Sequence, residues 1–143
     1  MDRKGIIVDR RQSHTIFMAK ILVVDDTENN RILITRQLQR RGYQVLTAND
    51  AFAGLALAKT KEPDLILMDI GLPGMDGYDA TRQLKGNSGT RTIPVIALTA
   101  HALPSDQDAS VAAGCDDYEI KPIDFPRLCK KIDGLLASTH LAP

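Results

Sequence analysis

Five short strand-like runs alternate with helical segments over most of the chain, and this alternation is the strongest constraint on its fold. The runs cover residues 21–24, 43–47, 64–68, 94–98 and 115–119. Most of them are rich in valine, isoleucine and leucine, which is typical of strands buried on both faces of a parallel sheet. Parallel strands need long, right-handed crossover connections, so the intervening helices cover both faces. The sequence therefore predicts an α/β fold with five parallel strands.

Capping and helix-breaking residues mark where the helices begin and end. Asp26 or Thr27 can cap the first helix, and Gly42 stops it. Asn49 or Asp50 can cap the second helix. We expect helices over about residues 27–41, 51–60, 78–85, 104–114 and 124–136. In the first helix, the side chains expected to face the core are Leu33, Ile34 and Leu38.

The size and charge of the chain exclude several classes of function. A chain of 143 residues is long enough for one domain with a core of its own. Its 18 basic and 18 acidic residues give a net charge of zero, which argues against direct binding to nucleic acid or to anionic membranes. No apolar stretch is long enough to span a bilayer, so we expect a cytoplasmic protein without membrane insertion. Cys115 and Cys129 lack metal-binding spacing and are expected to be reduced thiols, with a metal or redox role as the alternative.

The first eighteen residues differ in composition from the rest. Residues 1–18 contain four basic residues around two apolar patches that are too short for a signal peptide. We expect residues 1–18 to form a flexible leader, 19–137 a single domain and 138–143 a short tail. Met18 begins the run MAKILVVDD and is an alternative translation start, which N-terminal sequencing of the native protein would test.

Polar residues that can act on a phosphoryl group stand where the strands are expected to end. Asp25 and Asp26 follow KILVV, and Asp69 follows DLILM. Thr99 follows PVIAL, and Lys121 lies near the end of the last run. Ligands of open α/β sheets bind outside the carboxyl ends of the strands. The pattern therefore predicts one site for a hard cation and a phosphoryl group.

The three carboxylates have a specific chemical use in such a site. Asp69 is the candidate nucleophile, because a carboxylate can attack a phosphoryl group to form an acyl phosphate. Mg²⁺ prefers carboxylate, carbonyl and water oxygens and would screen the negative charges. Asp26 can ligate the ion directly, and Asp25 directly or through water. The tight loop after Asp69 could turn a backbone carbonyl toward the same ion, most plausibly that of Gly71. Lys121 and Thr99 would supply a cation and a hydroxyl donor to the phosphoryl oxygens.

Taken together, the motifs resemble the receiver domain of two-component response regulators. The similarity covers about residues 19–136 and rests on ILVVDD, LILMDIGLPGMDG, PVIALTA and GCDDYEIKP. It implies a flavodoxin-like doubly wound (βα)5 fold with strand order 2-1-3-4-5. It also implies that Asp69 is the phospho-acceptor and that Asp25 and Asp26 hold Mg²⁺, for which Mn²⁺ is a possible substitute.

The resemblance further implies a conformational switch. Thr99 resembles the hydroxyl that moves toward the phosphoryl group, and Lys121 the lysine that contacts it. Tyr118 matches the aromatic residue that turns inward on activation, and Pro122 is a candidate for a cis peptide bond. The responding surface of the family, its fourth helix, fifth strand and fifth helix, maps to about residues 105–136.

The expected function is that of a single-domain response regulator in a phosphorelay. Few residues follow the last helix, so its output is expected to pass through a separate protein; excision from a larger protein, such as a hybrid kinase, is the alternative. The expected donor is a sensor histidine kinase or a histidine phosphotransfer protein. The downstream protein target is unknown, and catalysis is limited to self-phosphorylation and autodephosphorylation, so the chain is not a conventional enzyme.

Other functions stay open on the sequence alone. A receiver-fold scaffold that carries no phosphate and a phosphate sink for a shared kinase are the main alternatives. An aspartyl-phosphate hydrolase would need an acid two residues after the nucleophile, where this chain has Gly71. A nucleotide-binding switch would need a glycine-rich loop after the first strand, where this chain has DDTENN.

Overall fold

A five-stranded parallel sheet forms the centre of the protein. The computed structural model describes residues 6–9, 14–101 and 103–141. The strands are β3 (Lys20–Val24), β4 (Gln44–Ala48), β5 (Leu65–Asp69), β6 (Val95–Thr99) and β7 (Asp117–Ile120). They lie in the order β4-β3-β5-β6-β7, and each neighbouring pair is parallel. Counted along the chain, this is the order 2-1-3-4-5, so the predicted fold class and topology are confirmed.

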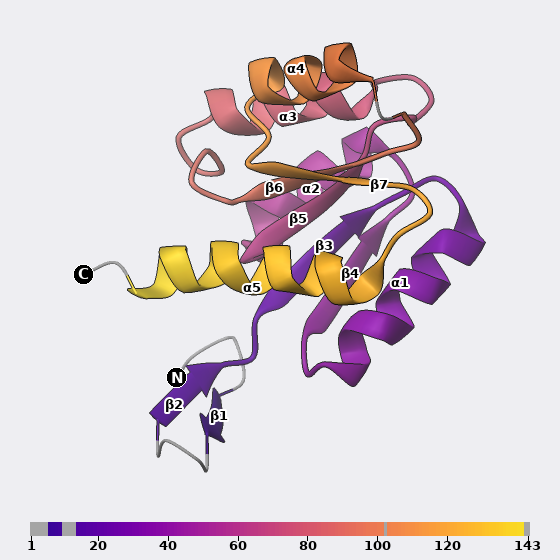
Figure 1. Cartoon of the computed structure of the whole chain (residues 1–143). Helices are drawn as coiled ribbons and strands as arrows, with labels where there is room; N and C mark the ends of the chain where they lie inside the picture. The colour runs from indigo at the N-terminus through magenta and orange to yellow at the C-terminus, as the bar shows by residue number, and fades with distance from the viewer. Residues whose placement is uncertain (1–5, 10–13, 102, 142–143) are drawn as a thin grey trace.

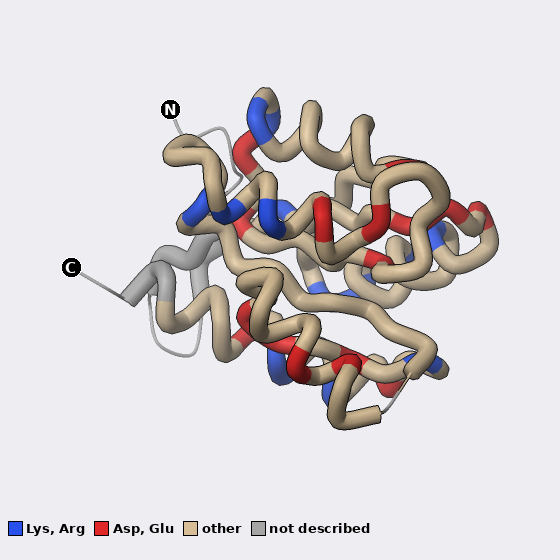
Figure 2. Tube along the Cα trace, turned by 90° about the horizontal axis from the view of Figure 1, so that it is seen from above, with Lys and Arg blue, Asp and Glu red and all other residues tan. Residues whose placement is uncertain are grey.

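Five helices cover the two faces of the sheet. They are α1 (Glu28–Arg40), α2 (Ala51–Lys61), α3 (Gly77–Gly86), α4 (Pro104–Ala113) and α5 (Phe125–Leu141). Figure 1 shows α1 and α5 on one face, α2 and α3 on the other, and α4 beside α3. Basic and acidic positions are interspersed along the described part of the trace (Figure 2). None of the helices in the described part of the chain is long and apolar enough to cross a bilayer.

The core consists of two apolar clusters, one on each side of the sheet. Alternate residues of β3 and β5 point to opposite sides: Ile21 and Leu65 join the cluster beneath α1 and α5, whereas Leu22 and Ile66 join the one beneath α2 and α3. All residues of β5 and β6 are buried. A strand buried on both faces is fixed in register, because slipping by one residue would exchange its two sets of side chains. The carboxyl end of β5 is therefore held firmly in place.

One predicted core residue of α1 is exposed. Ile34 and Leu38, one turn apart, are buried as predicted. The prediction for Leu33 is wrong, since 50% of its surface is exposed. The inward stripe of α1 is narrow here, and Leu33 lies beside it, where it lines a cavity at the end of the sheet.

The helix ends follow the local sequence closely. Asp50 precedes α2 and accepts a hydrogen bond from the backbone N–H of Ala53 (2.7 Å). Gly114 ends α4 with a φ of 98°, in the left-handed region that glycine tolerates. Helix α5 continues to Leu141, beyond the predicted end near residue 136.

The N-terminal segment contains two strands that the sequence did not predict. Strands β1 (Ile6–Asp9) and β2 (His14–Phe17) pair in an antiparallel hairpin. Residues 1–5, 10–13, 102 and 142–143 lie outside the described residues. The division into a flexible leader, a domain and a short tail stays a prediction.

Candidate functional site

The three aspartates predicted to share a site lie together at the carboxyl edge of the sheet. One carboxylate oxygen from each of Asp25, Asp26 and Asp69 can be chosen so that all three lie within 4.8 Å of one another. Asp25 follows β3 directly and is fully buried, whereas Asp69 is the last residue of β5 and is 5% exposed. Asp26 is exposed to solvent. The arrangement is a ring of hard oxygen donors with one open side, and this donor set fits Mg²⁺.

Asp69 is held by groups that favour its charged form, although its burial opposes them. Its Oδ1 accepts a hydrogen bond from the backbone N–H of Gly71 (3.0 Å) and lies 3.3 Å from Lys121 Nζ. Burial nevertheless raises the pKa of Asp69, to which the nearby Asp25 carboxylate adds a smaller increase. A divalent cation would offset both effects, because it favours the deprotonated carboxylate.

Lys121 lies between two of the carboxylates. Its Nζ is 3.3 Å from Asp69 Oδ1 and 3.6 Å from Asp25 Oδ2. Its backbone N–H donates to the carbonyl oxygen of Thr99 (2.7 Å), which ties the end of β7 to the end of β6. The Lys121–Pro122 peptide bond is cis. The ammonium group is thus placed where it can contact a phosphoryl group on Asp69.

Asp25 is oriented by the first turn of α1. Its Oδ1 accepts a hydrogen bond from the backbone N–H of Thr27 (2.8 Å), and its Oδ2 accepts one from Asn30 Nδ2 (3.5 Å). Its backbone carbonyl accepts from Arg31 Nη1 (2.7 Å). Asn30 and Arg31 were not among the residues predicted to form the site. The one sequence feature that could have identified them is their spacing after the aspartate pair, which places them in the first turn of α1, next to Asp25.

The two residues predicted to form the switch, Thr99 and Tyr118, lie in different surroundings. Thr99 is buried at the end of β6, and its Oγ1 accepts a hydrogen bond from the backbone N–H of His101 (3.1 Å). Tyr118 lies partly buried on β7, where Lys131 Nζ is 5.3 Å from the centroid of its ring. The structure therefore brings Thr99 to the edge where the aspartates lie, and it pairs the Tyr118 ring with α5.

Two glycines shape the loop that follows Asp69. Gly71 supplies the N–H that binds Asp69, while its carbonyl as a metal ligand stays a prediction. Gly77, the first residue of α3, has the more stringent requirement. A Cβ at Gly77 would lie 2.3 Å from the backbone oxygen of Asp69 and 2.9 Å from Ile70 Cα. The start of α3 thus packs directly against the backbone that carries Asp69, and only glycine allows this contact.

A cavity of about 210 Å³ opens beside the aspartates, between α1 and the loop from β7 to α5. Its polar lining residues are Asp25, Asn30 and Lys121, and its apolar ones are Leu33, Ile34, Pro122, Ile123 and Phe125. An apolar surface therefore adjoins the candidate phospho-acceptor.

Known proteins are similar to this chain in both sequence and fold. A protein PilH of Pseudomonas aeruginosa is 42% identical over 120 residues, which cover 84% of this chain and 99% of PilH. The polar-differentiation response regulator DivK of Brucella anthropi is 38% identical over 116 residues, covering 81% of this chain and 94% of DivK. The receiver domain of a sensor histidine kinase of Pseudomonas aeruginosa, solved with a magnesium ion in its active-site cleft, superposes with a TM-score of 0.78. It is 35% identical, and the match covers 83% of this chain and 98% of that domain.

The family model described as the response regulator receiver domain matches residues 21–133. That range contains the three aspartates, Thr99, Lys121 and the five strands of the parallel sheet except Lys20, the first residue of β3. The chain is thus a member of the response regulator receiver domain family.

Proposed function

We propose that this protein is a phosphoryl-accepting switch in which Asp69 receives the phosphoryl group of a histidine kinase or a histidine phosphotransfer protein. The observation that carries the proposal is the placement of Asp69 within reach of two further carboxylates and of Lys121 Nζ, 3.3 Å away. Three acidic groups and one cation at the carboxyl edge of an α/β sheet suit a phosphoryl group with a divalent ion. Mg²⁺ bound by Asp25, Asp26, Asp69 and the Gly71 carbonyl would neutralise charge on the phosphoryl oxygens.

In the transfer step, an Asp69 oxygen forms a bond to phosphorus while the phosphorus–nitrogen bond of the donor imidazole breaks. The electron pair of that bond stays on the imidazole nitrogen, and because the other ring nitrogen of the donor carries a proton, the donor leaves as neutral histidine. Lys121 contacts a phosphoryl oxygen as a point charge. Thr99 can donate its hydroxyl proton to another oxygen in place of its present long bond to the His101 carbonyl (3.4 Å).

The proposed output is a change on the surface formed by α4, β7 and α5. Thr99 and Tyr118 lie on the neighbouring strands β6 and β7, so a movement of the Thr99 hydroxyl reaches this surface over a short path. In this proposal a separate cytoplasmic protein recognises the altered surface. A phosphate sink would use the same acceptor site without such recognition.

The proposal is tested by incubating the protein with acetyl phosphate or phosphoramidate in Mg²⁺ and measuring its intact mass. We expect one added phosphoryl group, located on Asp69, which does not form when EDTA is present from the start of the incubation. If no adduct forms, beryllofluoride is added in its place. The absence of a Mg²⁺-dependent change with beryllofluoride as well would contradict the phospho-switch and favour a scaffold.

A change at Asp26 should weaken metal binding. Asp26→Ala removes an exposed carboxylate of the acidic cluster, so we expect the Kd for Mg²⁺ to rise about tenfold or more, equivalent to about 1.4 kcal/mol. Isothermal titration or NMR titration with Mg²⁺ measures it. Asp79→Ala, an exposed acidic position on α3, is the control. Equal affinities in the two variants would argue against direct ligation by Asp26.

The apolar cavity beside the site supports a protein as the physiological donor. A histidine side chain must approach Asp69 from solvent, and the element that carries it would contact the adjoining surface, where Leu33 is half exposed. We expect Leu33→Glu to slow transfer from a phosphorylated histidine donor about tenfold or more, by placing a charge in a desolvated contact.

The same variant should accept phosphate from acetyl phosphate at the wild-type rate, because that small donor needs no docking surface. Val111→Glu places the same charge on the exposed face of α4 and serves as the control. Slower uptake from both kinds of donor would show that Leu33→Glu damages the site itself.

A further inference from the structure

A buried carboxylate lies in the middle of β7, where the pattern of the sheet calls for an apolar residue. Glu119 is 0% exposed and lies two residues before Lys121. Burial alone would raise the pKa of Glu119, but hydrogen bonds from Arg127 and Lys131 outweigh it and lower the pKa. Glu119 is therefore ionised inside the protein, and it has no part in the phosphoryl chemistry described above.

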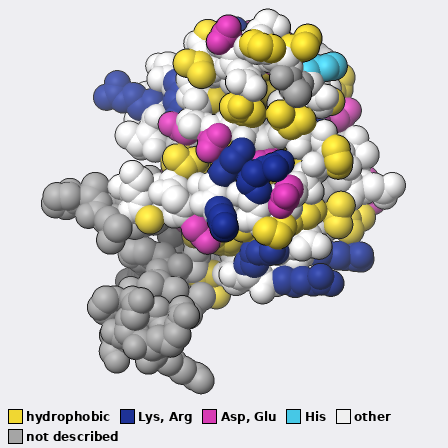
Figure 3. Space-filling view, in the orientation of Figure 1, with side chains coloured by type: hydrophobic (Ala, Val, Ile, Leu, Met, Phe, Trp, Pro, Cys, Tyr) yellow, Lys and Arg dark blue, Asp and Glu magenta, His cyan; other side chains and the backbone are white. Residues whose placement is uncertain are grey.

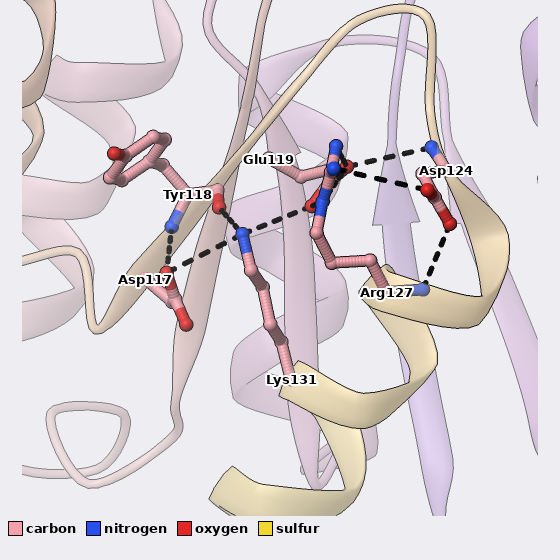
Figure 4. Close-up of polar contacts among 6 residues, drawn as sticks. All are labelled: Asp117, Tyr118, Glu119, Asp124, Arg127 and Lys131. Carbon is pink, nitrogen blue, oxygen red and sulfur yellow. Dashed lines mark hydrogen bonds and ion pairs between the residues drawn. The ribbon is translucent and has the colours of Figure 1, made fainter.

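The carboxylate of Glu119 binds groups from three places in the chain (Figure 4). Arg127 on α5 donates from Nη2 (2.6 Å) and from Nε (3.1 Å) to Glu119 Oε2. Lys131, one turn further along α5, lies with its Nζ 3.0 Å from Glu119 Oε1. The backbone N–H of Asp124 donates to Glu119 Oε2 (3.5 Å). The space-filling view shows a group of basic side chains with acidic neighbours at the centre of this face (Figure 3).

These contacts fix the loop that presents Lys121. At one end of the loop, the Lys121 backbone N–H is bound to the carbonyl of Thr99 (2.7 Å). At the other end, Asp124 is bound to Glu119 and caps α5 by accepting a hydrogen bond from the Arg127 N–H (3.0 Å). The backbone from residue 121 to 124 is thus anchored on both sides, and the side chain of Lys121 leaves it toward Asp69.

Attachment of α5 does not require this buried charge. Leu128, Ile132 and Leu136 of α5 already pack into the apolar core. A buried ion pair can often be replaced by apolar residues without loss of stability, since the desolvation of the charges offsets their attraction. The carboxylate instead fixes the orientation of α5. A guanidinium group that donates from two of its nitrogens restricts orientation more strictly than apolar contact does.

We propose that Glu119 is a positioning residue of the phosphorylation site, which holds Lys121 in place through Arg127 and Asp124. This inference rests on the proposed function, because Lys121 matters here as the group that contacts the phosphoryl oxygens. Glu119 contacts neither Asp69 nor the phosphoryl group, so its effect is indirect.

The test removes the contact between Arg127 and Glu119 by changing its exposed partner, Arg127, because this affects folding less than changing the buried Glu119 would. The Arg127 side chain is 53% exposed, so Arg127→Gln should fold. The control is Arg82→Gln on α3, which removes an ion pair of the same length (2.6 Å) from a side chain that is also 53% exposed. The initial rate of phosphoryl uptake from phosphoramidate in saturating Mg²⁺ is measured well below the Tm of each variant.

We expect Arg127→Gln to lower the uptake rate about tenfold, as a small misplacement of a reacting group does, and Arg82→Gln to leave it unchanged. Arg127→Lys retains a charge that can reach Glu119 and should recover part of the rate. In a Lys121→Gln background, Arg127→Gln should lower the rate less than about twofold, because the group it positions is already gone.

The outcomes separate the two proposals. If the wild-type protein takes up no phosphoryl group, the proposed function fails and this inference fails with it. If the wild-type protein takes up phosphate and Arg127→Gln matches it, this inference alone is overturned. An equal loss of rate with and without Lys121 would also overturn it, since a purely structural effect does not depend on Lys121.

Discussion

Asp69→Asn is expected to abolish the uptake of a phosphoryl group. The amide that replaces the carboxylate is a poor nucleophile and has one weak oxygen donor in place of two charged ones. The variant should still fold, because the amide oxygen can accept the hydrogen bond from the Gly71 N–H that Oδ1 now accepts. Intact mass after incubation with acetyl phosphate and Mg²⁺ measures the effect, and we expect no adduct in the variant.

The matched control is Asp79→Asn, which makes the same chemical change at an exposed position of α3. It should take up phosphate like the wild-type protein. An adduct of wild-type amount in Asp69→Asn would mean that another residue accepts the phosphoryl group. Mapping of the modified peptide would then identify that residue.

Gly77→Ala is expected to be more disruptive than the same substitution at any other described glycine. The new Cβ would lie 2.3 Å from the Asp69 backbone oxygen and 2.9 Å from Ile70 Cα, so the backbone must move. Forced overpacking of this kind costs about 2–3 kcal/mol, which corresponds to a fall in Tm of roughly 5–15 °C. Because the backbone that moves carries Asp69, we also expect weaker Mg²⁺ binding. Thermal unfolding and Mg²⁺ titration measure the two effects.

The same substitution at a second glycine, Gly134→Ala, is expected to stabilise the protein instead of destabilising it. Gly134 lies in α5, where a Cβ meets nothing within 4 Å. Alanine in a helix interior is favoured over glycine, so the free energy of unfolding should rise by about 0.5–1 kcal/mol. Equal Tm values for the two variants would show that the contact between Gly77 and the Asp69 backbone is softer than the structure indicates.

The main architecture was predictable because it depends on local signals. The alternation of strand-like and helical segments, with Asp50 and Gly114 at helix ends, gave five βα units. Strand boundaries moved by one residue, or by two at the start of β7, and Asp69 and Thr99 are the last residues of their strands rather than the residues after them. Two hairpin strands in the N-terminal segment were missed, because their short apolar patches have too little periodicity to tell a strand from a loop.

The site was predictable only in part, for a different reason. Residues at the carboxyl ends of parallel strands must converge, so the aspartates, Thr99 and Lys121 could be grouped from their spacing. Side chains that act through tertiary contact carry no such signal. Leu33 looked like a core residue because apolar periodicity does not define the width of the buried stripe. Glu119 carries no signal in the sequence, since only the packing of α5 brings Arg127 and Lys131 over it.

The location of Lys121 between Asp69 and Asp25 has a consequence for how readily the site exchanges its occupants. In the absence of other ligands, the ammonium acts as an internal counter-ion, so the carboxylates do not face each other uncompensated. An incoming divalent ion would have to compete with this resident cation, which would lower its affinity. In the proposed function, a phosphoryl group would bring negative charge of its own and offer the lysine a new partner. The same side chain would then restrain the empty site and stabilise the loaded one.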